Sequence, residues 1–147
     1  MQGNEVVQYY PGTDDVYRRY ETNARGERHG TFVRFHPNGQ VEIRCTYDRG
    51  TRMGPFTRYR NDGTVERRGS YHNNRMCGVY GEYNENGDIT AAGIYSCGMR
   101  TGPFVRMRDD GTEVQTFYGT TPETVGTQIT EEVYHDELKK TVDQIYP

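Results

Sequence analysis

The sequence predicts a mainly β protein, an elongated single antiparallel sheet of stacked β-hairpins followed by a C-terminal amphipathic α-helix. Three observations predict this class. Glycine and aromatic residues recur at a step of 24 residues, Asn-Gly or Asp-Gly pairs separate apolar stretches, and apolar residues recur at helical spacing near the C-terminus. The 13 Tyr and 18 Gly, with few Leu and Ala, likewise favour strands and turns over helices.

Length and composition limit the alternatives. The 147 residues are enough for one ordinary domain. A hydrophobic share of 32% and a mean hydropathy of −1.01 are too low for the deep core of a doubly wound or barrel fold. An aromatic share of 12% argues against a disordered chain.

Charge is unevenly distributed along the chain. The net charge of −3 argues against a nucleic-acid binder by bulk charge. Residues 1–111 hold all 16 Arg and 14 acids, for a net of +2, whereas residues 112–147 carry −5. Residues 112–147, the acidic tail, are therefore expected to form a segment that differs from the arginine-rich part of the chain before it.

The repeat consists of residue columns that stay in phase over four units. Its glycines form two such columns and its aromatic residues form three. The glycines are Gly30, Gly54, Gly78, Gly102 and Gly39, Gly63, Gly87, Gly111; the aromatic residues are Phe32, Phe56, Tyr80, Phe104, then Phe35, Tyr59, Tyr83, and Tyr47, Tyr71, Tyr95. We interpret all of them as structural residues of the repeat.

Each unit is expected to form two strands and two turns. In the first unit, Asn38-Gly39 is a strong hairpin signal, because glycine adopts a positive φ without steric cost. Gly50, in the second connection, suits a left-handed turn residue in the same way. Successive hairpins are then expected to continue one sheet.

The two-residue period of a strand predicts which side chains share a face. A bulge at the glycine columns would break this phase. Glycines opposite tyrosines are expected to let the rings lie flat across the sheet. In the first unit the predicted faces are Val33, Phe35, Val41, Ile43, Cys45, Tyr47 on one side and Phe32, Arg34, Glu42, Arg44, Thr46 on the other.

The pattern resembles the MORN repeat family in its variant with a 24-residue step. The segment Gly54-Pro55-Phe56-Thr57-Arg58-Tyr59, continued by Asn61-Asp62-Gly63 and Gly69-Ser70-Tyr71, carries the resemblance best. It extends over about residues 23–119. The last copy departs from it, since Glu113 stands in an apolar column and Gly119 in the tyrosine column; Val114 and Phe117 or Tyr118 would substitute after a shift.

Three segments follow from this repeat. Residues 1–29 are expected to form a degenerate N-terminal hairpin or cap, residues 30–119 four MORN-like repeats, and residues 120–147 an acidic helical tail. Four hairpins would span about 40 Å, and the ends of such a sheet invite edge-to-edge pairing. We therefore expect the chain to cap its edges or to use them for assembly.

The sequence of residues 120–147 predicts one helix of about 15 residues. Thr130 suits the N-cap, and Glu131 and Glu132 stand where the helix dipole favours acids. One helical face carries Tyr134, Leu138, Val142 and Ile145. This possible interface either packs on its own sheet or docks on a second subunit or another protein.

No catalytic motif of a common hydrolase, nucleotide-binding or zinc-protease type is present. The four His are scattered without ligand partners, and Glu42 and Glu66 recur with the repeat, unlike a unique acid–base pair. We therefore predict no enzyme activity, no metal site, no cofactor and no small-molecule substrate.

Arginine columns form the possible interaction surface, made of Arg34, Arg58, Arg106, Arg44 and Arg68. A second column, Arg28, Arg52 and Arg100, would extend it into a basic stripe interleaved with aromatics. Such a stripe suits anionic headgroups, RNA or an acidic partner. Alternatively, these arginines pair with Glu42, Glu66, Glu82 and Asp48 on a wet surface.

The three cysteines, Cys45, Cys77 and Cys97, have no CxxC spacing, so free thiols in a reducing, cytoplasmic compartment are expected. Cys45 is expected to be a small buried residue. No signal peptide or membrane-spanning run is visible in the sequence.

The function predicted is a non-enzymatic MORN-repeat scaffold or protein interaction module with a tendency to self-associate. Such a module could belong to a cytoskeletal, antitoxin-like or virion assembly. The alternative is a peripheral membrane adaptor that binds anionic phospholipid headgroups through its arginine and aromatic rows. No specific nucleic-acid partner is expected.

Overall fold

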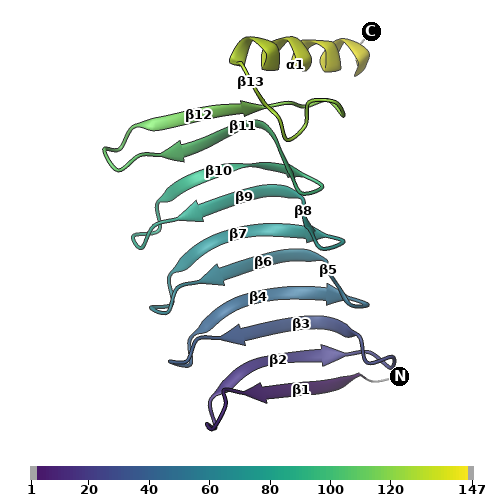
Figure 1. Cartoon of the computed structure of the whole chain (residues 1–147), viewed down its shortest axis with the longest axis vertical. Coiled ribbons are helices and arrows are strands. Elements are labelled where there is room, and N and C mark those ends of the chain that lie inside the picture. Colours follow the sequence, from purple (N-terminus) through teal and green to yellow (C-terminus); the bar gives the residue numbers. More distant parts are fainter. Residues whose placement is uncertain (1–2, 146–147) are drawn as a thin grey trace.

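The computed structural model describes residues 3–145, which form one open antiparallel sheet and one helix (Figure 1). Neighbouring strands of the sheet follow one another in chain order. They are β1 (Asn4–Tyr9), β2 (Val16–Thr22), β3 (Arg28–Phe35), β4 (Val41–Asp48), β6 (Gly54–Tyr59), β7 (Val65–His72), β9 (Gly78–Tyr83), β10 (Ile89–Ser96), β11 (Met99–Met107), β12 (Glu113–Tyr118) and β13 (Gln128–Ile129). The short strands β5 (Thr51–Arg52) and β8 (Arg75–Met76) pair with β4 and β7, and α1 (Glu131–Ile145) follows β13. The predicted fold class is confirmed.

Two kinds of turn alternate along the sheet. After β3, the Gly39 amide donates to the His36 carbonyl with φ of +88° at Gly39, and the same pattern recurs at Gly63, Gly87 and Gly111. After β4, Arg49 and Gly50 have φ of 47° and 88°, as a type I′ hairpin requires. Asn73 and Asn74 fill the equivalent place with φ of 50° and 68°, since Asn tolerates this region best among residues with a side chain.

Each type I′ turn is tied to the preceding repeat. The Gly50 amide donates to the Arg28 carbonyl (2.8 Å), and the bonds from Asn74 to Arg52 (3.1 Å) and from Gly98 to Met76 (2.7 Å) repeat it. At the end of the array, Gly126 donates to the Arg100 carbonyl (2.9 Å). The loop after β12 thus supplies the bond that a further repeat would have made.

The predicted faces are wrong from Ile43 onward. In the β3–β4 pair, Phe32 lies opposite Cys45 and Val33 lies opposite Arg44, and the register shifts by one residue at Glu42. This β-bulge reverses the face of every later residue of β4, so that Ile43, Cys45 and Tyr47 join Phe32. Equivalent bulges fall at Glu66 and Thr90. Between hairpins, the register also shifts at the glycine columns, at Gly30 in the β2–β3 pair and at Gly102 in the β10–β11 pair, as expected from the sequence.

One face of the sheet, here called the core face, holds the packed aromatic rings. Phe32, Phe56, Tyr80 and Phe104 are only 4–6% exposed, beneath Tyr47, Tyr71, Tyr95 and Tyr118. Glycines lie opposite these tyrosines, as in the pairs Gly30–Tyr47 and Gly54–Tyr71. Cys45 is buried in this cluster, at a column where Gly69 and Gly93 leave room for Phe56 and Phe104.

The last hairpin has a different register because β11 and β12 pair without a bulge. Tyr118 therefore lies opposite Gly102 and takes the place of the repeat tyrosine, while Gly119 falls outside the ladder. Phe117 then points to the other face, where its ring packs 5.1 Å from that of Tyr134 in α1. The shift expected from the sequence is thus present at Tyr118. The expected substitution by Val114 is wrong, because Glu113 pairs with Met107 as Val41 pairs with Phe35.

Helix α1 closes the C-terminal end of the sheet. The Val133 amide donates to the Thr130 hydroxyl (3.2 Å), which makes Thr130 the N-cap. Glu137 is buried and accepts hydrogen bonds from the Thr120 amide (2.9 Å) and the Thr124 hydroxyl (2.5 Å), so it ties the loop after β12 to the helix. Burial raises the pKa of this carboxyl, but those hydrogen bonds outweigh burial and leave the pKa below its ordinary value.

Candidate interaction surface

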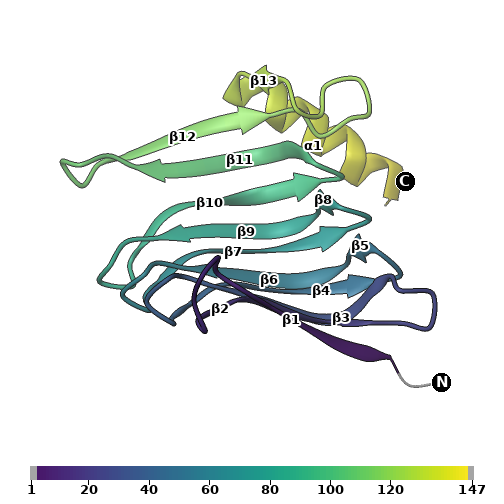
Figure 2. The same cartoon turned by 60° about the horizontal axis from the view of Figure 1, so that its bottom comes forward.

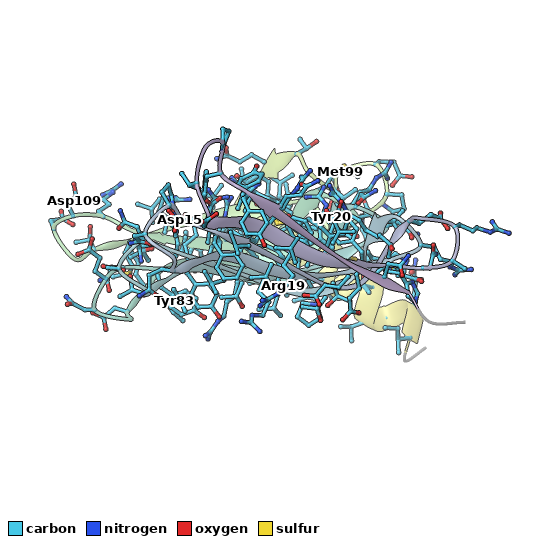
Figure 3. All side chains as sticks on the ribbon, turned by 90° about the horizontal axis from the view of Figure 1, so that it is seen from below. Asp15, Arg19, Tyr20, Tyr83, Met99 and Asp109 are labelled. Atoms are coloured by element: carbon cyan, nitrogen blue, oxygen red, sulfur yellow. The ribbon has the colours of Figure 1, made fainter. Side chains whose placement is uncertain are left out.

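The face opposite the core face, here called the open face, carries a continuous row of side chains. Cross-strand pairs connect Arg19, Val33, Arg44, Thr57, Arg68, Gly81 and Ala92 from β2 to β10. Figure 3 shows Arg19 and Tyr83 on this side of the sheet and Tyr20 on the other. Arginines on every second strand lie about 10 Å apart, which is two strand spacings.

The five arginines predicted to form one surface are divided between the two faces. Arg34, Arg58 and Arg106 lie toward the core face and contact the carboxylates of Glu42 (2.6 Å), Glu66 (3.2 Å) and Glu82 (3.2 Å). For these three residues the interpretation as ion pairs on a wet surface is correct.

Arg44 and Arg68 lie on the open face instead. Both are exposed, and no carboxylate of residues 3–145 comes within 4.0 Å of either guanidinium. The guanidinium of Arg68 lies 5.7 Å from the centroid of the Tyr83 ring. Glu42 and Glu66 do not reach them, because the bulges turn Arg44 and Arg68 to the open face and leave those carboxylates on the core face.

The second arginine column covers the buried rings. The Arg28 guanidinium lies 5.2 Å from the Phe32 ring, and that of Arg52 lies 4.3 Å from the Tyr71 ring. Arg100 contacts the hydroxyls of Tyr95 (3.4 Å) and Tyr118 (2.9 Å), and these hydrogen bonds raise its pKa. These arginines are packing residues, so they do not extend the open-face row.

Two equivalent depressions lie along the row. The first, of about 250 Å³, is lined by Thr31, Arg44, Thr46, Pro55 and Thr57. The second, of about 360 Å³, contains the residues 24 positions later, namely Pro55, Arg68, Ser70, Val79 and Gly81. Each depression combines a guanidinium with a hydroxyl and an apolar wall.

The second depression continues into an apolar patch made of Val79, Ile89, Ala92 and Ile94. Val79 lies opposite Ile94, and their side chains are 75% and 48% exposed. Sequence reasoning missed this patch. The available signal was the loss of arginine from its column at Ala92, which widens the apolar part of the face.

The predicted helix interface is only partly docked. In α1, Tyr134 packs on Phe117, whereas Leu138, Val142 and Ile145 are exposed. Figure 3 places the helix on the same side of the sheet as Arg19 and Tyr83. Its contribution to the fold therefore comes from Tyr134 and Glu137 rather than from the whole apolar stripe.

The third aromatic column also lies on the open face. Phe35, Tyr59 and Tyr83 are half-buried near the hairpin turns. The guanidinium of Arg19 lies 5.7 Å from the Phe35 ring, as that of Arg68 does from Tyr83. The column thus supports the repeat but stays outside the packed core.

Among residues 3–145, no three His, Cys, Asp or Glu side chains cluster closely enough to hold a metal ion. Helix α1, the helix of this part of the chain, is too short and too polar to cross a bilayer. The three cysteines are free, and burial raises the pKa of the Cys45 thiol.

The fold and its surfaces define the class, an open β-repeat sheet with one packed face and one face that is exposed except at single residues such as Val33 and Phe117. A family model described as the MORN repeat variant matches residues 28–49, the β3–β4 hairpin. This hairpin therefore matches the MORN repeat variant, and the predicted resemblance is confirmed over these residues. Such a repeat in an open sheet suggests a repeat scaffold or a binding module.

No curated protein matches the chain. Among solved structures, a crystal structure of the GtfA/B complex bound to UDP and GlcNAc is similar to 95% of this chain at 12% identity, with a TM-score of 0.26. This chain spans 28% of the length of that chain.

Proposed function

We propose that the protein is a non-enzymatic scaffold that binds protein partners on the open face of its sheet and associates with itself. The observation that carries the proposal is the difference between its arginines. Arg44 and Arg68 are exposed and lack a carboxylate partner among residues 3–145, while Arg34 has one and Arg58 has two.

The chemistry of the face indicates the kind of partner. A depression that joins Arg68 to Val79 and Ile89 fits a chain segment with acidic and apolar side chains close together. The open, repeated geometry favours an extended contact over a small ligand enclosed in a pocket. The three free cysteines support a reducing, cytoplasmic setting.

Photo-crosslinking tests the proposed face. A photoreactive residue in place of Val79 is expected to crosslink a partner in extracts of the protein's own source. A matched residue at Arg67, which is exposed on the core face, is expected to give no such product. Equal crosslinking from both positions would contradict a partner on the open face.

Charge reversal supplies the second arm of this test. The double variant R44E/R68E is expected to lose the Val79 crosslink. The control variant R25E/R108E changes the same charge at exposed residues outside the row and is expected to keep it. An unchanged crosslink in R44E/R68E would remove the arginines from the proposal.

A second candidate function is binding to an anionic membrane surface. The same two arginines favour it, because exposed guanidiniums without carboxylate partners suit anionic lipid headgroups. Flotation with vesicles of anionic and of zwitterionic lipid distinguishes the two functions. Salt-sensitive binding to anionic vesicles alone, lost in R44E/R68E, would favour the membrane, whereas no binding would end this candidate.

A further inference from the structure

The two ends of the sheet differ in the contacts that their last strands make. At the C-terminal end, β13 pairs with Phe117 and Tyr118, Gly119 forms a bridge with Val125, and α1 contacts β12. At the other end β1 pairs with β2, and no other strand of residues 3–145 pairs with β1 (Figure 2). An unpaired edge presents backbone groups that another strand can bind.

The hydrogen bonds of β1 show which backbone groups face outward. The Asn4 carbonyl accepts a bond from the Thr22 hydroxyl (3.2 Å), and the Tyr10 amide donates to the Asp15 carbonyl (2.9 Å). Both bonds point toward β2. Because successive residues of a strand turn their backbone groups to opposite sides, those of Glu5, Val7 and Tyr9 point away from the molecule.

The outer strand of this edge has few of the features that usually block pairing. Strand β1, Asn-Glu-Val-Val-Gln-Tyr, has no proline or lysine, and Glu5 is its only charged residue. The β1–β2 pair contains a bulge, but its extra residue is Tyr17 in β2, so β1 itself is continuous. Val7 and Tyr9 are 37% and 54% exposed. The edge therefore combines free hydrogen-bonding groups with apolar side chains.

We propose that β1 pairs antiparallel with β1 of a second copy of this chain, about a two-fold axis at Val7. The inference rests on the self-association in the proposed function and specifies its contact. In this register Val7 lies opposite Val7 of the second copy, and Glu5 lies opposite Tyr9. An axis at Glu5 would place two carboxylates directly opposite each other, which is unfavourable. An axis at Tyr9 would shorten the overlap.

The pairing has a defined stoichiometry and a consequence for the open face. It is isologous, because both copies use the same edge, so it closes as a dimer. Val7 lies opposite Arg19 in the β1–β2 pair, so it belongs to the open-face row. The dimer joins the rows of both copies into one surface with twice the number of equivalent sites, and a linked partner gains avidity from it.

Substitution of Val7 tests the contact. Val7→Pro removes the outward N–H group, and proline is tolerated on an edge strand where that group faces solvent. The wild-type protein is expected to show twice the 17.0 kDa chain mass in light scattering, and V7P the mass of one chain with an unchanged circular dichroism spectrum. The control Val7→Thr keeps the N–H group and is expected to remain dimeric. A monomeric wild-type protein, or a dimeric V7P, would overturn the proposal.

Disulfide formation tests the register. In a background with Cys77→Ser and Cys97→Ser, V7C is expected to form a crosslinked dimer on mild oxidation, because a hydrogen-bonded pair at the axis has Cα atoms about 5.5 Å apart. E5C is expected to stay uncrosslinked, because the two Glu5 positions would be about 14 Å apart. Equal or faster crosslinking of E5C would overturn the Val7 register.

The two proposals fail separately. V7P retains Arg44, Arg68 and Val79, so loss of its dimer with an intact Val79 crosslink supports the β1 contact independently of the partner. Conversely, R44E/R68E is expected to remain dimeric. Dissociation of R44E/R68E together with dimeric V7P would place the self-contact on the open face and overturn the β1 proposal.

Discussion

The core face and the open face use the same residue type for different purposes. On the core face, Arg52 lies 4.3 Å from the Tyr71 ring and Arg58 contacts Glu66. On the open face, Arg44 and Arg68 recur at the same step of 24 residues with no carboxylate within 4.0 Å in the described chain. Arginine in a repeat column therefore identifies a binding surface only once its face is known.

The difference follows from how a single-layer sheet builds a core. A sheet without a second layer has nothing to pack against, so the rings of one face must cover one another. Arginine side chains assist, because their methylene stems and guanidinium planes cover apolar rings while the charge stays near water. The opposite face is then available for contact with another molecule.

The largest expected effect is the loss of a buried ring. Phe56→Ala should lower the free energy of unfolding by about 3–5 kcal/mol, because it removes a ring that is 4% exposed and packs on Tyr71. Urea denaturation measures it. Thr46→Ala, at an exposed position of the open face, should change the same quantity by no more than about 0.5 kcal/mol. Similar losses for both variants would contradict the assignment of the core to one face.

Two glycines on opposite faces of the sheet are expected to give the next largest difference in stability. Gly93→Ala should cost about 1–3 kcal/mol, since a Cβ there would lie 2.0 Å from Cδ2 of Phe104. Gly81→Ala, on the open face, would place its Cβ no closer than 3.5 Å to the Tyr83 hydroxyl and should be nearly neutral. Thermal unfolding of the two variants side by side would show whether the core-face glycines serve the rings.

Arginine truncation should show a smaller difference in stability. Arg52→Ala should cost about 0.5–1 kcal/mol through the lost contact with the Tyr71 ring, whereas Arg44→Ala should have no measurable effect on unfolding. Denaturation curves and Val79 crosslinking together separate the roles. The expected result is that R44A weakens crosslinking without loss of stability, and that R52A does the reverse.

The smallest effect on stability at neutral pH is expected for Glu137, the buried carboxylate that ties α1 to the loop after β12. The pKa of Glu137 lies below its unfolded value of about 4.3, so this group stabilises the fold above that pH, and the contribution is lost as pH falls through the folded pKa. Glu137→Gln should therefore lower the melting temperature at pH 7 and leave it nearly unchanged at the acid end of the curve. A pH-independent difference between wild type and variant would contradict the charged role of Glu137.

Local features of the molecule could be predicted from residues alone. The turn at Asn38-Gly39, the glycine at position 50 and the cap at Thr130 each depend on the conformation of a few neighbouring residues. The position of Tyr118 in the tyrosine column was also within reach, because Gly119 disrupted that column. The docking of α1 was only half predictable, since its apolar face indicated Tyr134 but gave no sign that Glu137 would be buried.

By itself, the sequence determined the repeat, its turns, the stacked hairpins and the helix, because each depends on short-range backbone preferences. Only the tertiary structure decided which side chains share a face. A single extra residue at Glu42 or Glu66 moves the side chains that follow it in the strand to the opposite face of the sheet. Such a bulge depends on how two strands pair and not on the conformational preference of one strand. For the same physical reason, the separation of Arg44 and Arg68 from the carboxylates, and the apolar patch beside them, became visible only in the folded sheet.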